Sequence, residues 1–273
     1  MNTEATQAYY ENSPAARWLA LASISISTFC VSITMSAVNI AVPAIALDFN
    51  ANAVLVGWVP TAFLLANAIF LIPAGRAADI YGRKKIFLIG MTVFCLSCLM
   101  AYLAPNIEIL LLTRLLQGFG GALSFATGLA IIMSIFTSEN RGSAIGFSAG
   151  TLYFGLSCGP VVGGWFTELF GWRVVFLFPL VLGSLSIVLI LLKLKGEWQN
   201  DHPGKVDYLG TLIFAISASC LYIGISSVPG MLATSLLAIG TALMVLFVYQ
   251  QTQCEFPLIH FKGIIQNRMF SRS

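Results

Sequence analysis

Residues 75–85 gather charge in a chain that has little of it. The segment reads Gly-Arg-Ala-Ala-Asp-Ile-Tyr-Gly-Arg-Lys-Lys and lies between two long apolar runs, although only 9% of the chain is charged. Glycine permits turns and close backbone approach, and an aspartate can cap a helix or pair with a base. We therefore predict a short polar loop at a membrane surface with the form of a tight hinge. Its key residues are Gly75, Asp79, Gly82, Arg83 and Lys84.

Arg114 places a charge inside the fourth apolar run. Gln117, Gly118 and Gly121 follow at i+3, i+4 and i+7, so the four residues share one helix face. A charge inside a bilayer costs roughly 2.5 to 3.5 kcal/mol on insertion scales. We therefore predict that Arg114 and Gln117 face a cavity inside the protein. The alternative is that the long arginine side chain reaches the membrane surface near Glu108.

Glycines recur along the fifth apolar run. Because they lack side chains, they let a neighbouring helix approach closely, and a proline among them removes a backbone hydrogen bond and can kink the helix. We predict a nearly continuous glycine stripe that starts at residue 142 and includes a bendable helix interface, with plain helix packing as the alternative. The residues of this interface are Gly155, Gly159, Pro160, Gly163 and Gly164.

The sequence has motifs that resemble catalytic or metal-binding sites, but it lacks the partner residues that such sites need. Residues 146–150 read Gly-Phe-Ser-Ala-Gly, the spacing of a hydrolase nucleophile elbow, but that motif needs a strand–turn–helix context and a histidine partner. The two histidines, His202 and His260, lie in predicted loops. Cys95 and Cys98 have no histidine or acid beside them, and we expect buried thiols. The sequence predicts no enzyme, no metal, no cofactor and no nucleic-acid partner.

The composition predicts a protein solvated by the lipid bilayer. The chain is 58% hydrophobic with a mean hydropathy of +0.88, whereas an ordinary soluble domain is about 25% charged. Spanning a bilayer takes about 20 apolar residues in a helix, and the apolar runs do not alternate as membrane strands do. We predict an all-α polytopic fold with eight transmembrane helices, at 18–43, 54–74, 86–104, 107–136, 143–166, 173–193, 208–227 and 231–250.

Lysine and arginine positions predict the orientation. With the N-terminus in the cytoplasm, all of the 14 Lys and Arg residues except Arg114 and Arg173 fall on the cytoplasmic side. Both termini are therefore expected in the cytoplasm. The predicted segments are a cytoplasmic tail at 1–17, a six-helix bundle at 18–193, a cytoplasmic loop at 194–207, two additional helices at 208–250 and a cytoplasmic segment at 251–273.

Together these motifs resemble those of the major facilitator superfamily. Residues 75–85 resemble its signature loop between spans two and three, residues 110–122 resemble its fourth-span motif, and residues 155–164 resemble the motif that marks antiporters in this superfamily. Shorter matches point to the branch of fourteen-span drug:proton antiporters, at 36–43, 171–176 and 206–210. The resemblance implies the N-terminal half of a major facilitator fold plus two extra helices.

The resemblance also implies a function. It points to efflux of small amphipathic compounds or drugs across the plasma membrane, coupled to protons. It places Arg114, Gln117, Asn39 and Thr34 along the transport cavity, and it makes residues 75–85 the gating loop. A facilitator for a metabolite is one alternative, and a non-transporting remnant or partner half of another transporter is a second.

Two features depart from the family pattern. The family usually has an acid in the first span where this chain has Thr34, and no acidic residue lies deep in a predicted span. A proton carrier inside a membrane is normally a carboxylate, so proton coupling rests on the resemblance alone. Transporters of this type also have two halves, and we expect a truncated or fragmentary copy whose second half is missing. A homodimer that completes the pathway is the alternative.

Overall fold

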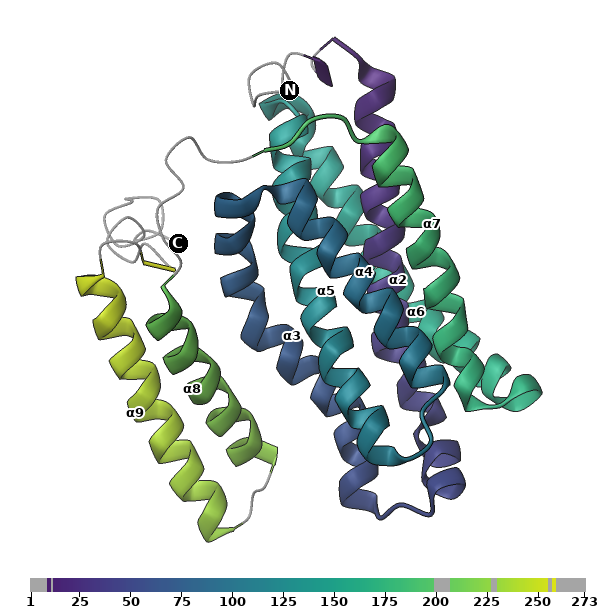
Figure 1. Cartoon of the computed structure of the whole chain (residues 1–273), viewed down its shortest axis with the longest axis vertical. Helices are drawn as coiled ribbons and strands as arrows, with labels where there is room; N and C mark the ends of the chain where they lie inside the picture. The colour runs from purple at the N-terminus through teal and green to yellow at the C-terminus, as the bar shows by residue number, and fades with distance from the viewer. Residues whose placement is uncertain (1–8, 11, 199–206, 227–229, 255–256, 259–273) are drawn as a thin grey trace.

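The computed structural model describes residues 9–10, 12–198, 207–226, 230–254 and 257–258 (Figure 1). Within them the chain is all-α, and eight helical segments are long and apolar enough to cross a membrane, which confirms the predicted fold class. The helices are α2 (Pro14–Phe49), α3 (Ala53–Tyr81), α4 (Arg83–Tyr102), α5 (Ile107–Ile135), α6 (Ser138–Phe170), η1 (Trp172–Phe176) continuing into α7 (Leu177–Lys193), α8 (Tyr208–Ser226) and α9 (Met231–Gln253).

The prediction that residues 75–85 form an irregular loop is wrong, because nearly all of them are helical. Helix α3 continues to Tyr81 and α4 begins at Arg83, so Gly82 alone separates them. The φ angle of Gly82 is 101°, which glycine adopts readily and other residues rarely do. Arg83 pairs with Asp79, so these charges are matched across the break and do not require an unwound segment. These residues can therefore carry their charges while they remain in helices.

Asparagines mark the boundaries of several helices. Oδ1 of Asn52 at the start of α3, and Oδ1 of Asn106 at the start of α5, each accept a backbone N–H three residues on, at 2.9 Å. These bonds satisfy N–H groups that a helix leaves unpaired at its first turn. Helix α2 continues beyond its predicted end at residue 43 and stops at Phe49, where Asn50 takes a left-handed conformation with φ 46°.

Helices α2 to α7 pack into one bundle (Figure 1). Helix α2 packs against α6 and α7, α5 packs against α3 and α4, and contacts between α4 and α7 join the two groups. Helices α8 and α9 pack mainly on each other, and α8 also touches α3. Parts of the predicted segments 1–17, 194–207 and 251–273 lie outside the described residues.

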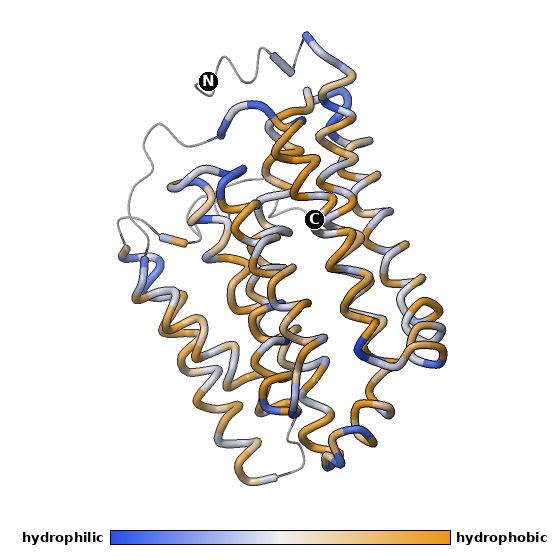
Figure 2. The backbone as a smooth tube through the Cα atoms, turned by 45° about the vertical axis from the view of Figure 1, so that its right-hand side comes forward, coloured by the Kyte–Doolittle hydropathy of each residue, from blue (hydrophilic) through white to orange (hydrophobic). Residues whose placement is uncertain are grey.

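Charged residues gather at the two ends of the bundle, while hydrophobic residues fill the length between them (Figure 2). One end carries Asp79 and Arg83, and we call it the Asp79 end. The other carries Asp48 and Arg173, which form an ion pair at 2.6 Å, and we call it the Asp48 end. The interior between them is mainly apolar, with fully buried aromatic residues such as Phe87, and it also holds the buried side chains of Arg114 and Gln117.

The glycines of α6 form two sections with different surroundings. Gly155, Gly159 and Gly163 pack against α2, and a Cβ at Gly163 would lie 2.5 Å from the carbonyl oxygen of Ala37. The prediction of one nearly continuous packing stripe is therefore wrong toward the Asp79 end of α6. There a Cβ would meet nothing within 4 Å at Gly142, Gly146 or Gly150.

Candidate functional site

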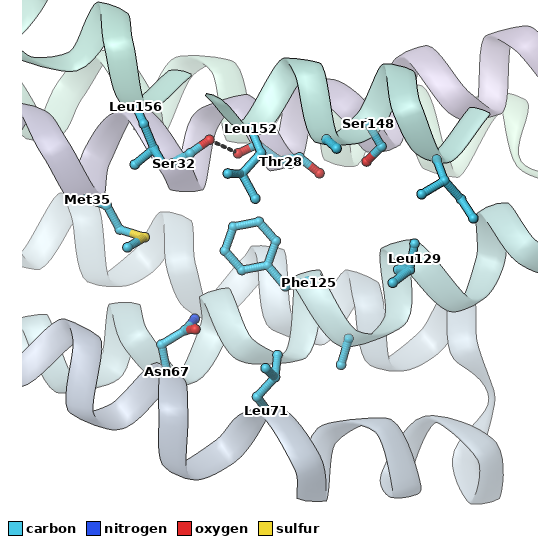
Figure 3. A pocket seen from close by; sticks show the side chains of 13 residues that line it. Thr28, Ser32, Met35, Asn67, Leu71, Phe125, Leu129, Ser148, Leu152 and Leu156 are labelled. Atoms are coloured by element: carbon cyan, nitrogen blue, oxygen red, sulfur yellow. Dashed lines mark hydrogen bonds between the residues drawn. The ribbon is translucent and has the colours of Figure 1, made fainter. Parts of the chain in front are cut away.

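A cavity of about 600 Å³ lies between α2, α3, α5 and α6 (Figure 3). Its polar groups come from Thr28, Ser32, Asn67 and Ser148, and its other lining residues are Ala, Ile, Leu, Met and Phe. No ionisable residue lines it among those that the structure describes. Cavities of this size with apolar walls and a few polar groups are typical of small-molecule sites. This cavity therefore suits an amphipathic compound held by neutral hydrogen bonds.

Asn67 contributes the most versatile polar group of the cavity. Its Nδ2 donates to the carbonyl oxygen of Gly118 on α5 at 3.3 Å, and its Oδ1 has no partner among the described residues. Thr28 and Ser32 donate their hydroxyl hydrogens to carbonyl groups of their own helix and keep lone pairs that can accept. In Figure 3 the ring of Phe125 lies between Asn67 and Thr28. A bound compound would therefore meet hydrogen-bonding groups on opposite sides of an aromatic ring.

Arg114 is fully buried, which rules out the alternative that its side chain reaches the membrane surface. Nε donates to the carbonyl oxygen of Val59 on α3 at 3.0 Å, and Nη1 donates to Oε1 of Gln117. The guanidinium carbon lies 4.6 Å from the ring centre of Phe63. Nη2 has no hydrogen-bond partner among the described residues. Arg114 thus joins α5 to α3 and keeps one buried donor unused.

Gln117 extends this cluster to α4, because its Nε2 lies 3.1 Å from Sγ of Cys98. Cys98 is fully buried and Cys95 is 6% exposed, as the sequence predicted, and both are free thiols. The cluster of Arg114, Gln117 and Cys98 connects three helices. It does not line the cavity, whose walls are other residues of the same bundle.

The other two residues predicted for the cavity lie elsewhere on α2. Thr34 is buried and donates to the carbonyl oxygen of Cys30 at 2.7 Å, while Asn39 is exposed. Neither lines the cavity, so their transport role stays a prediction. The sequence analysis missed Asn67 and Phe125. An amide in the middle of the apolar run 54–74 was the signal that could have identified Asn67.

Arg83 connects three helices at the Asp79 end. Its Nη2 lies 2.9 Å from Oδ1 of Asp79 across the α3–α4 break. Its Nη1 donates to the carbonyl oxygen of Ala130 at 3.1 Å and to Oγ of Ser134, both on α5. The predicted gating residues Asp79, Gly82 and Arg83 therefore do lie together, and Arg83 holds α3, α4 and α5 in one arrangement. Gly75 precedes Asp79 by about one turn of α3, and a Cβ there would meet nothing within 4 Å.

Glu197, which the sequence analysis did not identify, completes this end of α4. Its carboxylate accepts the backbone N–H of Lys84 at 2.7 Å and of Lys85 at 3.1 Å. Lys84 in turn donates its ammonium group to the carbonyl oxygen of Leu194. A Cβ at Gly82 would lie 2.7 Å from Cδ of Glu197, and this flexible side chain would have to shift, while the φ angle of 101° favours glycine for its conformation.

The predicted antiporter motif brings α6 onto α2. A Cβ at Gly159 would lie 1.8 Å from Oγ of Ser36, and one at Gly155 would lie 2.7 Å from Oγ of Ser32. Pro160 is exposed within α6, and a Cβ at Gly164 would make an ordinary contact of 3.6 Å. Close packing of two helices is what small residues allow in a membrane, and here it forms one wall of the cavity.

Comparison with known proteins places this geometry in a family. Residues 24–252 match the Major Facilitator Superfamily. The chain is 26% identical to the riboflavin transporter RibZ of Clostridioides difficile over 89% of this chain and 54% of that protein. It is 32% identical to the lincomycin resistance protein of Streptomyces lincolnensis over 89% and 51%. It is 30% identical to the multidrug resistance protein Stp of Mycobacterium tuberculosis over 88% and 46%.

The chain thus spans about half the length of the curated relatives it matches. The match runs from residue 24, within α2, to residue 252, in the last turn of α9. These three relatives are named as one transporter and two resistance proteins. With its eight apolar helices and a matched region that covers most of its length, the chain belongs to the Major Facilitator Superfamily.

Proposed function

We propose that this chain supplies the N-terminal half of an exporter of small amphipathic compounds, of the fourteen-span antiporter branch. The observation that carries the proposal is the cavity between α2, α3, α5 and α6, which is apolar, uncharged and provided with neutral hydrogen-bonding groups. Relatives named for lincomycin, multidrug and tetracenomycin C resistance support export of such compounds.

Residues 75–85 would act as the gate in this proposal. With the Asp79 end in the cytoplasm, most lysines and arginines of the chain lie on that side, which the positive-inside rule favours. Transporters of this type alternate access by rocking one half against the other. Arg83 holds three helices at this end, so a change in its pairing with Asp79 would alter how the bundle meets the second half.

Proton coupling would need a group in the transport pathway that gains and loses a proton, normally a carboxylate. The described carboxylates of this bundle lie near helix ends, at Asp48, Asp79, Glu108, Glu139 and Glu168. None of these described carboxylates lines the cavity. We propose that any carboxylate that carries the proton belongs to the second half, and that Arg114 contributes through its fixed charge.

A metabolite transporter is the second candidate, because one relative is named as a riboflavin transporter. Riboflavin and amphipathic drugs would both be matched by apolar walls with a few neutral polar groups, so the cavity does not separate them. The two candidates differ in the direction of transport and in the compounds that are transported.

Accumulation in an efflux-deficient bacterial strain tests the proposal. Cells that express the complete reading frame encoding this chain should accumulate several-fold less of a lipophilic fluorescent dye than cells with an empty vector. A collapse of the proton gradient with an uncoupler should remove the difference if transport is proton-coupled. Equal dye accumulation together with faster riboflavin uptake would favour the metabolite transporter.

A further inference from the structure

A groove of about 420 Å³ lies between the beginning of α2 and the end of α7 at the Asp79 end. It is separate from the cavity, with which it shares no lining residue. Tyr9, Ser13, Lys193 and Lys195 supply its polar groups, and Ala, Leu19 and Leu192 supply its apolar wall. The groove therefore combines cations and hydroxyls with an apolar surface where two membrane spans meet water.

The two lysines of the groove are available to a ligand. Both are exposed, and neither forms an ion pair among the described residues. Nζ of Lys195 lies 5.0 Å from the ring centre of Tyr9, so an aromatic face positions this cation without neutralising it. Leu19 and Leu192 are 49% and 68% exposed. Two exposed cations that form no ion pair with the described residues lie beside exposed leucines, and together they complement a phosphate group joined to an acyl chain.

Buried residues fix the backbone that carries these lysines. The hydroxyl of Tyr10 accepts the backbone N–H of Lys195 at 2.8 Å and donates to the carbonyl oxygen of the same residue at 3.2 Å. Tyr10 is fully buried, and its ring centre lies 5.7 Å from that of Trp198, which is 3% exposed. Leu194, between the two lysines, is 1% exposed. The groove is therefore formed before a ligand arrives, which reduces the entropy lost on binding.

We propose that this groove binds the headgroup of an anionic phospholipid. The phosphate would lie between Lys193 and Lys195, and an acyl chain would follow Leu19 and Leu192 along the spans. Charge complementarity and the place of the groove at the end of two membrane helices argue for a lipid, because a soluble anion would gain nothing from the leucines. The proposal does not depend on the cargo or on the direction of transport.

Native mass spectrometry of the purified protein with added phosphatidylglycerol or phosphatidylcholine tests this. Phosphatidylglycerol should bind roughly tenfold or more tightly, as two basic residues near an anionic headgroup would give. The double variant Lys193→Gln, Lys195→Gln should bind both lipids equally, and Lys193→Arg, Lys195→Arg should keep the preference. Arg141→Gln removes an exposed base at the same end outside the groove, and it should also keep the preference.

Salt provides a second measurement on the unaltered protein. Raising the ionic strength from about 0.1 M to 1 M shortens the screening length from about 10 Å to 3 Å, so the preference for phosphatidylglycerol should shrink several-fold. Equal affinity of the unaltered protein for the two lipids would overturn the proposal, and so would a preference that persists in the double glutamine variant. Displacement of the lipid by an equal concentration of inorganic phosphate would assign the groove to a free anion and overturn it as well.

Discussion

The carboxylate of Glu197 accepts the backbone N–H of Lys84 at 2.7 Å, across 113 residues of chain. The first N–H groups of a helix have no partner within it, and Gly82, which precedes α4, has no side chain to cap them. Glu197 takes that role from the segment after α7. The segment that follows α7 is therefore bonded to the first turn of α4, which lies within the proposed gate.

The cap by Glu197 predicts a specific loss of stability. Glu197→Ala should lower the free energy of unfolding by about 1 kcal/mol, as loss of a helix cap does. Thermal unfolding in detergent measures it. Glu139→Ala is the matched control, because Glu139 is an exposed acid in the first turn of α6, and it should shift the midpoint less. Equal shifts in the two variants would show that the contact contributes nothing beyond general charge.

The close packing of α6 on α2 predicts opposite effects at two glycines. Gly163→Ala would place a Cβ 2.5 Å from the carbonyl oxygen of Ala37, and overpacking of this kind costs about 1 to 3 kcal/mol. Gly146→Ala meets open space and should be neutral or stabilise by up to about 1 kcal/mol, because alanine favours helix more than glycine. Unfolding midpoints in detergent compare them. Similar midpoints for both variants would contradict the described packing.

The helices of this protein were predictable from its sequence, whereas the cavity was not. Long apolar runs with few charges identify membrane spans because no other structure satisfies their backbone in lipid. The cavity depends on which faces of α2, α3, α5 and α6 meet, and Asn67 and Ser148 are separated in sequence and belong to different helices. The role of Glu197 could not be predicted either, because a local sequence pattern does not reveal a helix cap that comes from a distant segment.

The pair of Asp79 and Arg83 predicts a loss of transport without a large loss of stability. The pair is partly exposed, and such pairs contribute at most about 1 kcal/mol. Asp79→Asn leaves Arg83 its bonds to α5. Dye efflux should fall markedly while the unfolding midpoint changes by only a few degrees. Asp48→Asn, which breaks the pair at the other end, should preserve more efflux. Undiminished efflux in Asp79→Asn would exclude a gating role for this pair.

The hairpin of α8 and α9 should weaken in acid. Burial alone would raise the pKa of Asp207, but hydrogen bonds from Gly210, Gln250, Gln251 and Cys254 hold that pKa below its ordinary value. A carboxyl group with a lower pKa in the folded state stabilises it above the unfolded value of about 3.9. That contribution disappears as the pH falls through the folded pKa.

The unfolding midpoint should therefore drop between pH 6 and pH 3. Asp207→Asn should lower the midpoint at pH 6 and reduce the difference between the two pH values. An Asp207→Asn variant with the full pH dependence of the unaltered protein would assign the effect to other carboxylates.

Filling the cavity tests the central claim most directly. Ser148 lines the cavity on α6, whereas Val161 on the same helix is 75% exposed and does not line it. Ser148→Trp and Val161→Trp add the same side chain inside and outside the proposed site. Dye accumulation in efflux-deficient cells is the measurement, with membrane levels of each variant matched. We expect accumulation at the empty-vector level for Ser148→Trp and at the unaltered level for Val161→Trp. Efflux by Ser148→Trp equal to that of the unaltered protein would contradict the assignment of this cavity to the cargo.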